Sequence, residues 1–230
     1  MRIAINHLTR MKPGYICVAG IDLDTGRHVR PVLAGRLPRS LLRQEGGVFE
    51  IGMVVDLGEV RPVGKAPETE DVSFEIKNTR IVDTLDDKQF WAVIGRSARD
   101  SFNEIFGDDL QPHGRGLAVS VNHGSASLGC LRTNTTPVLI TAEYFGKESL
   151  RVRISDAGKE FGLSVTDIRL YEKDQVTLNH AEIQRVTQLL RKGKESLLSV
   201  GLSRPWLKPG DNEPRHWLQL NNIHLKTNLS

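Results

Sequence analysis

Residues 201–225 read GLSRPWLKPGDNEPRHWLQLNNIHL and carry the strongest structural signal in the chain. The end of this segment alternates apolar and polar residues, as a half-buried strand does. Its apolar residues fall in two pairs of opposite parity, Leu218 with Leu220 and Ile223 with Leu225. Both pairs can reach one core only if the strand contains an extra residue. The sequence therefore predicts a β-bulge at Asn221-Asn222, and the alternative is that these asparagines only end the strand or form a turn.

The same segment gathers tryptophan, arginine, histidine and asparagine, which folding alone does not require. Two like charges, Arg204 and Arg215, flank a loop that proline restricts at both ends, and they repel unless an anion or a carboxylate lies between them. This arrangement predicts an anion-accepting site with an aromatic face for a base. Its expected members are Arg204, Arg215, His216 and Asn222, with Trp206 or Trp217 beside them. The alternative is that both tryptophans are core residues and the arginines are solvated.

A second concentration of polar residues lies near the N-terminus, in NHLTR at 6–10 and RHVRP at 27–31. His28 and Arg30 would extend the binding surface if the two ends of the chain meet. Three interpretations remain open for this cluster: an exposed strand, a ligand site without turnover, or catalysis with histidine as acid and base.

Composition places the chain among ordinary globular proteins. Its 230 residues are 39% hydrophobic and 26% charged, with a net charge of +3, and the pI is about 8.9. This basic bias is compatible with nucleic acid and too small to imply it. Cys17 and Cys130 lie in apolar, strand-like runs, which predicts buried free thiols in a reducing compartment. No long apolar run is present, so we expect a cytoplasmic protein that does not contact a membrane.

The pattern along the chain is mainly short strands. Two helices stand out by their 3.6-residue period, at 86–106 and at 179–192, and the second has capping-box spacing at its start. The segment 108–116 is the expected linker. Strands are expected at 15–23, 27–33, 49–60, 72–82, 117–122, 126–133, 138–145, 149–155, 163–171, 197–203 and 216–225.

Each half of the chain is thus a series of short strands with one helix. The predicted fold class is mainly β with two helices (α+β), arranged as two packed barrels of the oligonucleotide/oligosaccharide-binding (OB) type. The expected domains are 1–112, with helix 86–106, and 113–230, with helix 179–192. Each helix would cover one barrel end and leave Arg96, Arg99, Arg185 and Arg191 exposed.

Four stretches carry a resemblance to a known family. GYICVAGIDLDTGRHVRPV near the start, VTDIRLYE at 165–172, VGLSRPW and HWLQLNNIHL resemble the dual-OB domain family of prokaryotic conflict and antiphage-defence loci. The resemblance covers nearly the whole chain. It implies two packed OB-like barrels and a role in sensing or holding nucleic acid or a nucleotide, and it supplies no catalytic residues.

Motifs for other chemistry are weak. The seven histidines are dispersed and no metal-ligand spacing occurs, so no metal and no cofactor are expected. Asn122-His123-Gly124-Ser125 is better explained as a polar turn than as a nucleophile beside a base. Glu75-Ile76-Lys77 has nuclease-like spacing, but it is typical of an ordinary alternating strand.

The sequence thus favours a nucleic-acid or nucleotide-binding module, acting as a sensor or accessory subunit in a prokaryotic defence system. Its expected partners are single-stranded nucleic acid or a nucleotide, and an effector protein from the same locus. Two alternatives remain open. One is a protein–protein adaptor that uses Trp206 and Trp217, and the other is a small enzyme that acts on a phosphorylated or ribosylated ligand.

Overall fold

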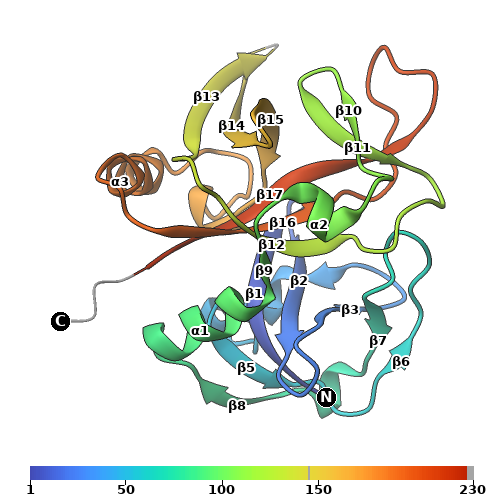
Figure 1. The fold of residues 1–230 in the computed structure, drawn as a ribbon. Helices are drawn as coiled ribbons and strands as arrows, with labels where there is room; N and C mark the ends of the chain where they lie inside the picture. Colours follow the sequence, from blue (N-terminus) through green and yellow to red (C-terminus); the bar gives the residue numbers. More distant parts are fainter. Residues whose placement is uncertain (145, 227–230) are drawn as a thin grey trace.

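A computed structural model describes residues 1–144 and 146–226 and divides their strands between two sheets, one below the other in Figure 1. The first sheet has the order β6-β7-β3-β2-β1-β5-β8, and β4 also pairs with β2. Its strands are β1 Arg2–Arg10, β2 Tyr15–Asp22, β3 His28–Val32, β4 Leu37–Pro38, β5 Met53–Asp56, β6 Arg61–Pro62, β7 Asp71–Ser73 and β8 Arg80–Thr84.

The second sheet contains the later strands in the order β13-β14-β15-β17-β16-β12-β9. The long strand β17 pairs with β16 and β11 antiparallel and with β15 parallel, which makes it the centre of this sheet. The strands are β9 Ala98–Arg99, β10 Gln111–His113, β11 Gly116–Ser120, β12 Leu128–Arg132, β13 Val138–Tyr144, β14 Lys147–Asp156, β15 Lys159–Val165, β16 Ser196–Leu202 and β17 Arg215–Leu225.

Three α-helices and four short 3₁₀ helices complete the described part of the chain. The α-helices are α1 Asp87–Ser97, α2 Phe102–Phe106 and α3 His180–Arg191, and the 3₁₀ helices are η1 Arg39–Leu41, η2 Arg43–Glu45, η3 Ile76–Asn78 and η4 Ile168–Leu170. None of the described helices is long and apolar enough to cross a bilayer.

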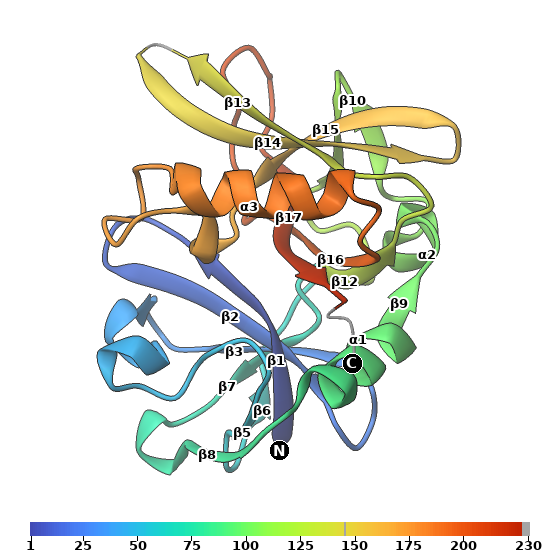
Figure 2. The same cartoon turned by 90° about the vertical axis from the view of Figure 1, so that its left-hand side faces the viewer.

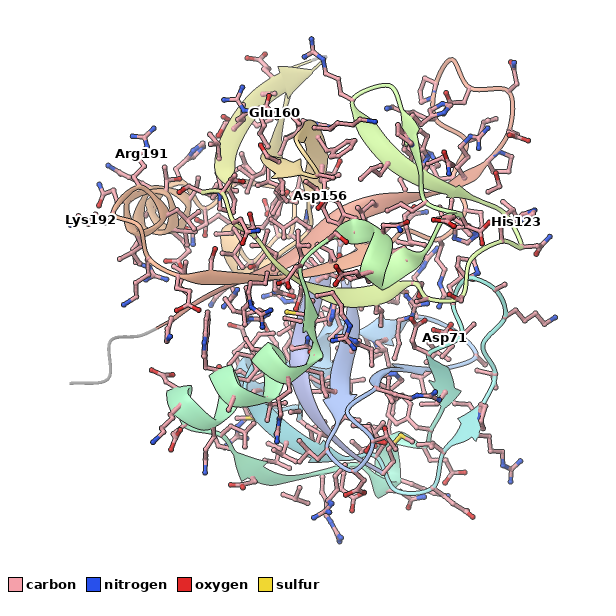
Figure 3. All side chains as sticks on the ribbon, in the orientation of Figure 1. Asp71, His123, Asp156, Glu160, Arg191 and Lys192 are labelled. Atoms are coloured by element: carbon pink, nitrogen blue, oxygen red, sulfur yellow. The ribbon has the colours of Figure 1, made fainter. Side chains whose placement is uncertain are left out.

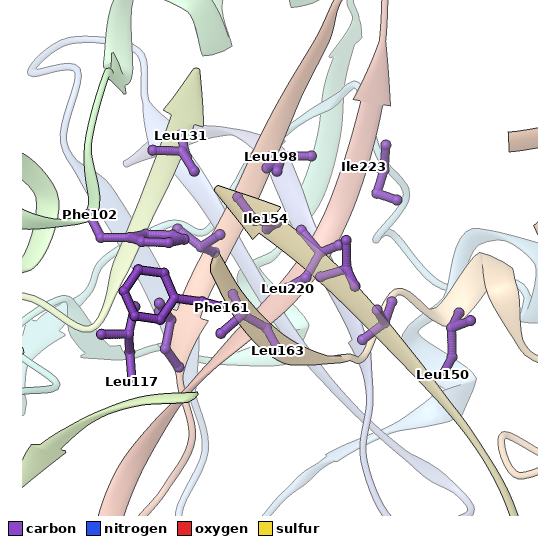
Figure 4. Packing of buried hydrophobic residues seen from close by; sticks show 14 of the residues in the cluster. Phe102, Leu117, Leu131, Leu150, Ile154, Phe161, Leu163, Leu198, Leu220 and Ile223 are labelled. Atoms are coloured by element: carbon purple, nitrogen blue, oxygen red, sulfur yellow. The ribbon is translucent and has the colours of Figure 1, made fainter. Parts of the chain in front are cut away.

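The mainly β, α+β class is confirmed, and the two OB-like halves are two sheets of which neither is a closed barrel. Within residues 1–144 and 146–226, the strands at the two ends of each sheet do not pair with each other, so both sheets stay open. Each sheet has its own core: one apolar cluster is built from residues 3–74 and another from residues 102–223. Figure 4 shows part of the second cluster, in which Phe102 packs edge-on against Phe161.

The division at residue 112 stays a prediction, and the packing favours an earlier boundary. Phe102, Phe106 and Leu110 all lie in the second apolar cluster, although the predicted first domain contains them. The expected linker at 108–116 is structured as well, because β10 and β11 pair as a hairpin that turns at Gly114, which has φ +60°. The two sheets therefore separate between Thr84 and Ala98.

The single helix predicted at 86–106 is wrong, because two helices replace it. Ala98 pairs in parallel with Cys130 of β12, so the main chain leaves the helix to join the second sheet. Ser101 then caps a new helix by accepting a hydrogen bond from the Glu104 amide at 3.2 Å. The helical spacing of apolar residues continues across residues 98–101, which is why the sequence predicted one helix. The main chain there pairs with the edge of β12 instead.

The helix α1 packs between the two sheets and does not cover one barrel end. Val93 and Ile94 belong to a third apolar cluster with Ala4 of β1, Cys130 of β12 and Leu197 of β16. Burial raises the pKa of the Cys130 thiol to about 12, which fits the expected buried thiol, whereas Cys17 is only partly buried. The four arginines Arg96, Arg99, Arg185 and Arg191 are exposed, as predicted.

The bulge in β17 is confirmed. Ser199 pairs with Asn222 and Val200 pairs with Leu220, so Asn221 is the extra residue. Leu218, Leu220 and Ile223 are all buried as a result. Gly201 of β16 accommodates the bulge, because a Cβ at this position would lie 2.5 Å from the Asn221 amide nitrogen.

The helix α3 follows its predicted bounds. The Asn179 side chain accepts a hydrogen bond from the Glu182 amide at 3.0 Å, and Gly193 follows the last turn with φ +73°. Its buried face consists of Ile183, Val186 and Leu190.

The helix offers a matched pair of leucines for a stability test. Leu190 is buried and its neighbour Leu189 is half-buried. Leu190→Ala should lower the free energy of unfolding by about 2–5 kcal/mol, because it removes buried methyl groups and leaves a cavity. Leu189→Ala should cost clearly less. Urea unfolding followed by circular dichroism measures both, and equal losses would contradict this packing of α3.

Candidate functional site at the junction of the two sheets

Side chains, not a continuous ladder, join β1 of the first sheet to β17 of the second. The Asn222 amide accepts a hydrogen bond from the Leu8 amide at 2.7 Å and donates one to the Leu8 carbonyl at 3.1 Å. Asn222 thus takes the place of a main-chain partner, and it is fully buried. The predicted ligand-binding role for Asn222 is not supported by this geometry, because both of its polar atoms are used inside the junction.

A buried polar cluster surrounds this contact. The Ser199 hydroxyl lies 2.9 Å from the Asn6 carbonyl and 2.9 Å from the His224 ring nitrogen, and it accepts from the Asn6 amide at 3.1 Å. The His7 ring lies 3.1 Å from the Asn221 amide and packs edge-on against His28. The exposed-strand interpretation of residues 6–10 is therefore wrong for Asn6 and His7, since they lie in the junction.

The three histidines of this cluster are held neutral. Burial, followed by the nearby His28, His224 and Arg30, lowers the pKa of His7 well below its usual range. Burial and then Arg169 lower the pKa of His224 to about 3. Burial and then Arg99 lower the pKa of His28 to about 4. Protonation would therefore place an unsatisfied charge between the sheets.

A second polar contact joins the sheets through the loop that precedes β7, where Figure 3 labels Asp71. The Glu70 carboxylate accepts hydrogen bonds from the Ser127 amide at 2.7 Å and the Leu128 amide at 3.1 Å, both from the second sheet. Burial raises the pKa of Glu70, while the Ser127 contacts oppose that shift.

Glu68 of the same loop and Asp71, the first residue of β7, neutralise two of the three arginines that the sequence assigned to ligand binding. Asp71 accepts from Arg30 at 2.5 Å and from Arg204 at 2.6 Å. Glu68 lies 3.2 Å from Arg204 and 3.4 Å from His216. Carboxylates of the protein thus neutralise Arg204, although they do not lie between Arg204 and Arg215.

The expected anion site does not assemble. Arg204 and His216 share the acids of the loop before β7, whereas Arg215 donates to the Ser120 hydroxyl at 3.1 Å and pairs with Glu213. Asn222 lies in the junction with Leu8. These side chains therefore belong to three separate hydrogen-bonded groups, and their role in ligand binding stays a prediction.

The two tryptophans of the terminal segment have different environments. Trp217 is buried, and its indole nitrogen donates to the Trp206 carbonyl at 3.2 Å. The Trp206 side chain is 54% exposed beside Leu207 at 52%. Of the aromatic pair predicted to face a base, only Trp206 offers a free face.

Two depressions lie elsewhere, at the junction itself. One of about 410 Å³, here called the α1 pocket, lies between α1 and the end of β17, which approach each other in Figure 2. Among its lining residues are Lys88, Phe90, Trp91, Arg169, His224 and Lys226. A second of about 540 Å³, the η2 pocket, lies between η2 and η4. Both are lined by Ile51 and Arg169, so the two pockets adjoin, and together they are called the junction groove.

The lining of the junction groove contains more basic than acidic side chains, and three of the basic ones, Arg39, Arg169 and Lys226, are paired with acids beside the groove. Its lining contains six basic and three acidic side chains: Arg39, Arg43, Lys88, Arg169, Lys173 and Lys226 against Glu50, Asp87 and Glu172. Among the described residues, no salt bridge engages Arg43, Lys88 or Lys173. The groove thus combines a surplus of positive charge with the half-buried ring of Trp91.

Arg169 is the fixed point of this groove. Its Nε and Nη2 atoms donate to the buried Asp167 carboxylate at 2.9 and 2.7 Å, and Nη2 also donates to the Ile223 carbonyl at 2.7 Å. Its Nη1 has no hydrogen-bond partner within the described residues, and 41% of the side chain is exposed. Asp167 itself accepts from the Ile223 amide at 3.1 Å, which ties this arginine to the junction.

The sequence prediction missed the junction groove. VTDIRLYE at 165–172 contains both Asp167 and Arg169, and it contributed only to the family resemblance. Arg39, Arg43, Lys88 and Lys226 lie in four separate elements, and their proximity depends on how the sheets pack. Within the described residues, no cluster of three His, Cys, Asp or Glu side chains has the geometry of a metal site.

The comparison with family models matches residues 1–223, nearly the whole chain, to a family described as the dual OB-containing domain. No curated protein matches the chain.

The amide of Asn222 provides a test of the junction. Asn222→Ala should lower the free energy of unfolding by about 1–3 kcal/mol for each buried group left without a partner, the amide and the carbonyl of Leu8. Asn212→Ala, at an exposed loop position, is the matched control and should change stability little. Thermal unfolding measures both. An unchanged Tm for Asn222→Ala would contradict the assigned role.

The neutral histidines predict acid sensitivity. Their folded pKa values lie below the unfolded value, so their contribution to stability is complete above pH 6.5 and is lost as pH falls toward their folded pKa values. Between the unfolded and the folded pKa, each histidine should lower the free energy of unfolding by about 1.4 kcal/mol per pH unit. Urea unfolding between pH 8 and pH 4.5 measures the slope. His224→Gln should reduce the slope, and His180→Gln, at an exposed position, should not. Equal slopes in all three proteins would contradict the assignment.

Proposed function

The chain belongs to the dual OB-containing domain family, and we propose that it is a nucleic-acid or nucleotide-binding module. OB folds bind oligonucleotides and oligosaccharides, so the family supports a binding function at that level. The surplus of basic side chains in the lining of the junction groove favours oligonucleotides over oligosaccharides, because a neutral oligosaccharide has no phosphate that could pair with them.

The observation that carries the proposal is the combination of cations and an aromatic ring in one groove. Binding of single-stranded nucleic acid requires positive charge along the backbone and ring faces for the bases. Arg43, Lys88 and Lys173 supply charge without a salt-bridge partner in the described chain, and Trp91 supplies a partly accessible ring. The site proposed from the geometry thus differs from the terminal segment that the sequence favoured.

The biological setting remains a hypothesis within this proposal. We place the protein in the cytoplasm of a prokaryote as a sensor or accessory subunit of a defence system, with an effector protein from the same locus as its partner. Two free cysteines are consistent with a reducing compartment.

One observation favours a second candidate function, a protein–protein adaptor. Trp206 and Leu207 are adjacent, both are more than half exposed, and hydrogen bonds between the main chains of Trp206 and Arg215 fix the backbone beneath them. An exposed tryptophan on a fixed backbone is typical of an interface anchor. Adaptor binding would depend weakly on salt, whereas nucleic-acid binding would depend on it strongly.

The enzyme alternative rested on Asn6, His7, Arg10, His28 and Arg30. Asn6, His7 and Arg30 are buried, and Arg10 donates to the Gln175 carbonyl at 2.9 Å. These side chains bond to one another and to the junction, so they do not surround a space that a small molecule could enter.

Fluorescence anisotropy with labelled single-stranded DNA and RNA tests the proposal. The logarithm of the affinity should fall linearly with the logarithm of salt concentration. The slope should correspond to a few phosphates neutralised by the protein. Arg43→Ala and Lys88→Ala should each reduce the slope by about 1.

Lys159→Ala is the matched control, since it removes an exposed charge at the β14–β15 turn, and it should leave the slope unchanged. Absence of binding at low salt, or a flat salt response, would refute the proposal and favour the adaptor.

A further inference from the structure

We infer that the α1 pocket takes a single nucleotide unit, with Arg169 receiving its 5′-phosphate and Trp91 packing against its base. This inference rests on the proposed function and names the ligand of the same groove. The unit has two sources that share this chemistry, a free nucleoside monophosphate and the phosphorylated end of a strand.

Arg169 is preorganised to receive a phosphate. Two of its donors are fixed on Asp167, which is 1% exposed, so the guanidinium plane cannot rotate away from the groove. The remaining nitrogen, Nη1, has no hydrogen-bond partner within the described residues, and Arg169 lines both the α1 and the η2 pocket. A phosphate that binds there pays little entropy for ordering this arginine, because Asp167 has already ordered it.

Neighbouring cations provide the additional charge that a phosphate needs, since Asp167 balances Arg169. Lys88 of α1 and Lys226 after β17 line the same pocket. Lys226 pairs with Glu195 at 2.6 Å, but that pair is about half exposed, so exchange of Glu195 for a phosphate requires little desolvation.

The other side of the α1 pocket suits one base. Leu85, Phe90 and Trp91 give it an apolar wall, and Phe90 is held edge-on against His224 at 5.2 Å. Lys226 Nζ lies 5.7 Å from the centre of the Trp91 ring, which places a cation close to the ring and to any base beside it.

The size of the site limits the ligand to one base. A volume of about 410 Å³ is at the lower end of the range for small-molecule sites. The adjoining η2 pocket has aromatic residues too, but Phe49 and Tyr171 are buried and offer no face for a second base. Its exposed groups are charged, so a longer strand would continue there through phosphate contacts alone.

The experiment uses the full chain and isothermal titration with 5′-AMP, adenosine, inorganic phosphate and a single-stranded 12-mer with or without a 5′-phosphate. We expect 5′-AMP, or the 5′-phosphorylated 12-mer, to bind at least tenfold more tightly than adenosine, inorganic phosphate or the unphosphorylated 12-mer. Tight binding of 5′-AMP identifies a free nucleotide, and a preference confined to the 12-mer identifies a strand end.

Variants locate the site. Arg169→Lys keeps the charge but loses the fixed fork, and it should weaken binding at least tenfold, as should Trp91→Ala. Arg153→Lys and Ile140→Ala, at exposed positions of β14 and β13, are controls that should leave affinity unchanged. Thermal unfolding of each variant identifies any loss of folding. A protein with Trp206→Phe and Trp217→Phe keeps Trp91 as its only tryptophan, and ligand should quench its fluorescence.

Other outcomes overturn the inference in distinguishable ways. If the 12-mer binds equally well with and without its 5′-phosphate and Arg169→Lys binds as the wild type does, the nucleotide site is wrong while the proposed function stands. If inorganic phosphate binds as tightly as 5′-AMP, the pocket recognises phosphate without a base. If no nucleotide and no oligonucleotide binds, both the inference and the proposed function fail.

Discussion

The contact between β1 and β17 is the interaction on which the rest of the structure depends. The two open sheets share no continuous ladder, and one main-chain hydrogen bond, from Arg10 to Thr166, joins them beside this contact. Side chains must satisfy the other main-chain groups where β1 meets β17. Asn222 pairs with both polar groups of Leu8, and Asp167 accepts from the Ile223 amide. Each of these side chains is buried, and an unpaired group at either position would cost the full desolvation of a polar atom. These contacts align Asn222 of β17 with Leu8 of β1, and a shift of either strand would break them.

This junction also creates the groove. Asp167 holds β17 with one oxygen and shares both oxygens with Arg169, so the residue that joins the sheets also orients the arginine that faces solvent. The α1 helix contributes in the same way, since Val93 and Ile94 pack between the sheets while Lys88 and Trp91 line the groove. Rigid elements thus position groups of both kinds, cationic and aromatic.

The polar composition of the junction has a further consequence. Three histidines are neutral there because burial and nearby arginines oppose their protonation. A neutral imidazole can donate one hydrogen bond and accept another, which suits the carbonyl and hydroxyl partners of His224 and the amide partner of His7. The concentration of histidine and asparagine at both ends of the sequence therefore reflects the demands of the junction.

Local patterns in the sequence determined those features that depend only on residues close together in the chain. The parity change around Asn221 predicted the bulge, and the spacing of Asn179 and Glu182 predicted the start of α3, because both features follow from strand and helix periodicity. The β-rich class followed for the same reason. Tertiary structure decided the break in the first helix, where β12 offers an edge to Ala98, and the pairing of Arg204 with acids 133 and 136 residues earlier. It also created the junction groove, which combines α1, η2, η4 and the end of β17, because no local pattern reports which distant surfaces a polar junction will bring together.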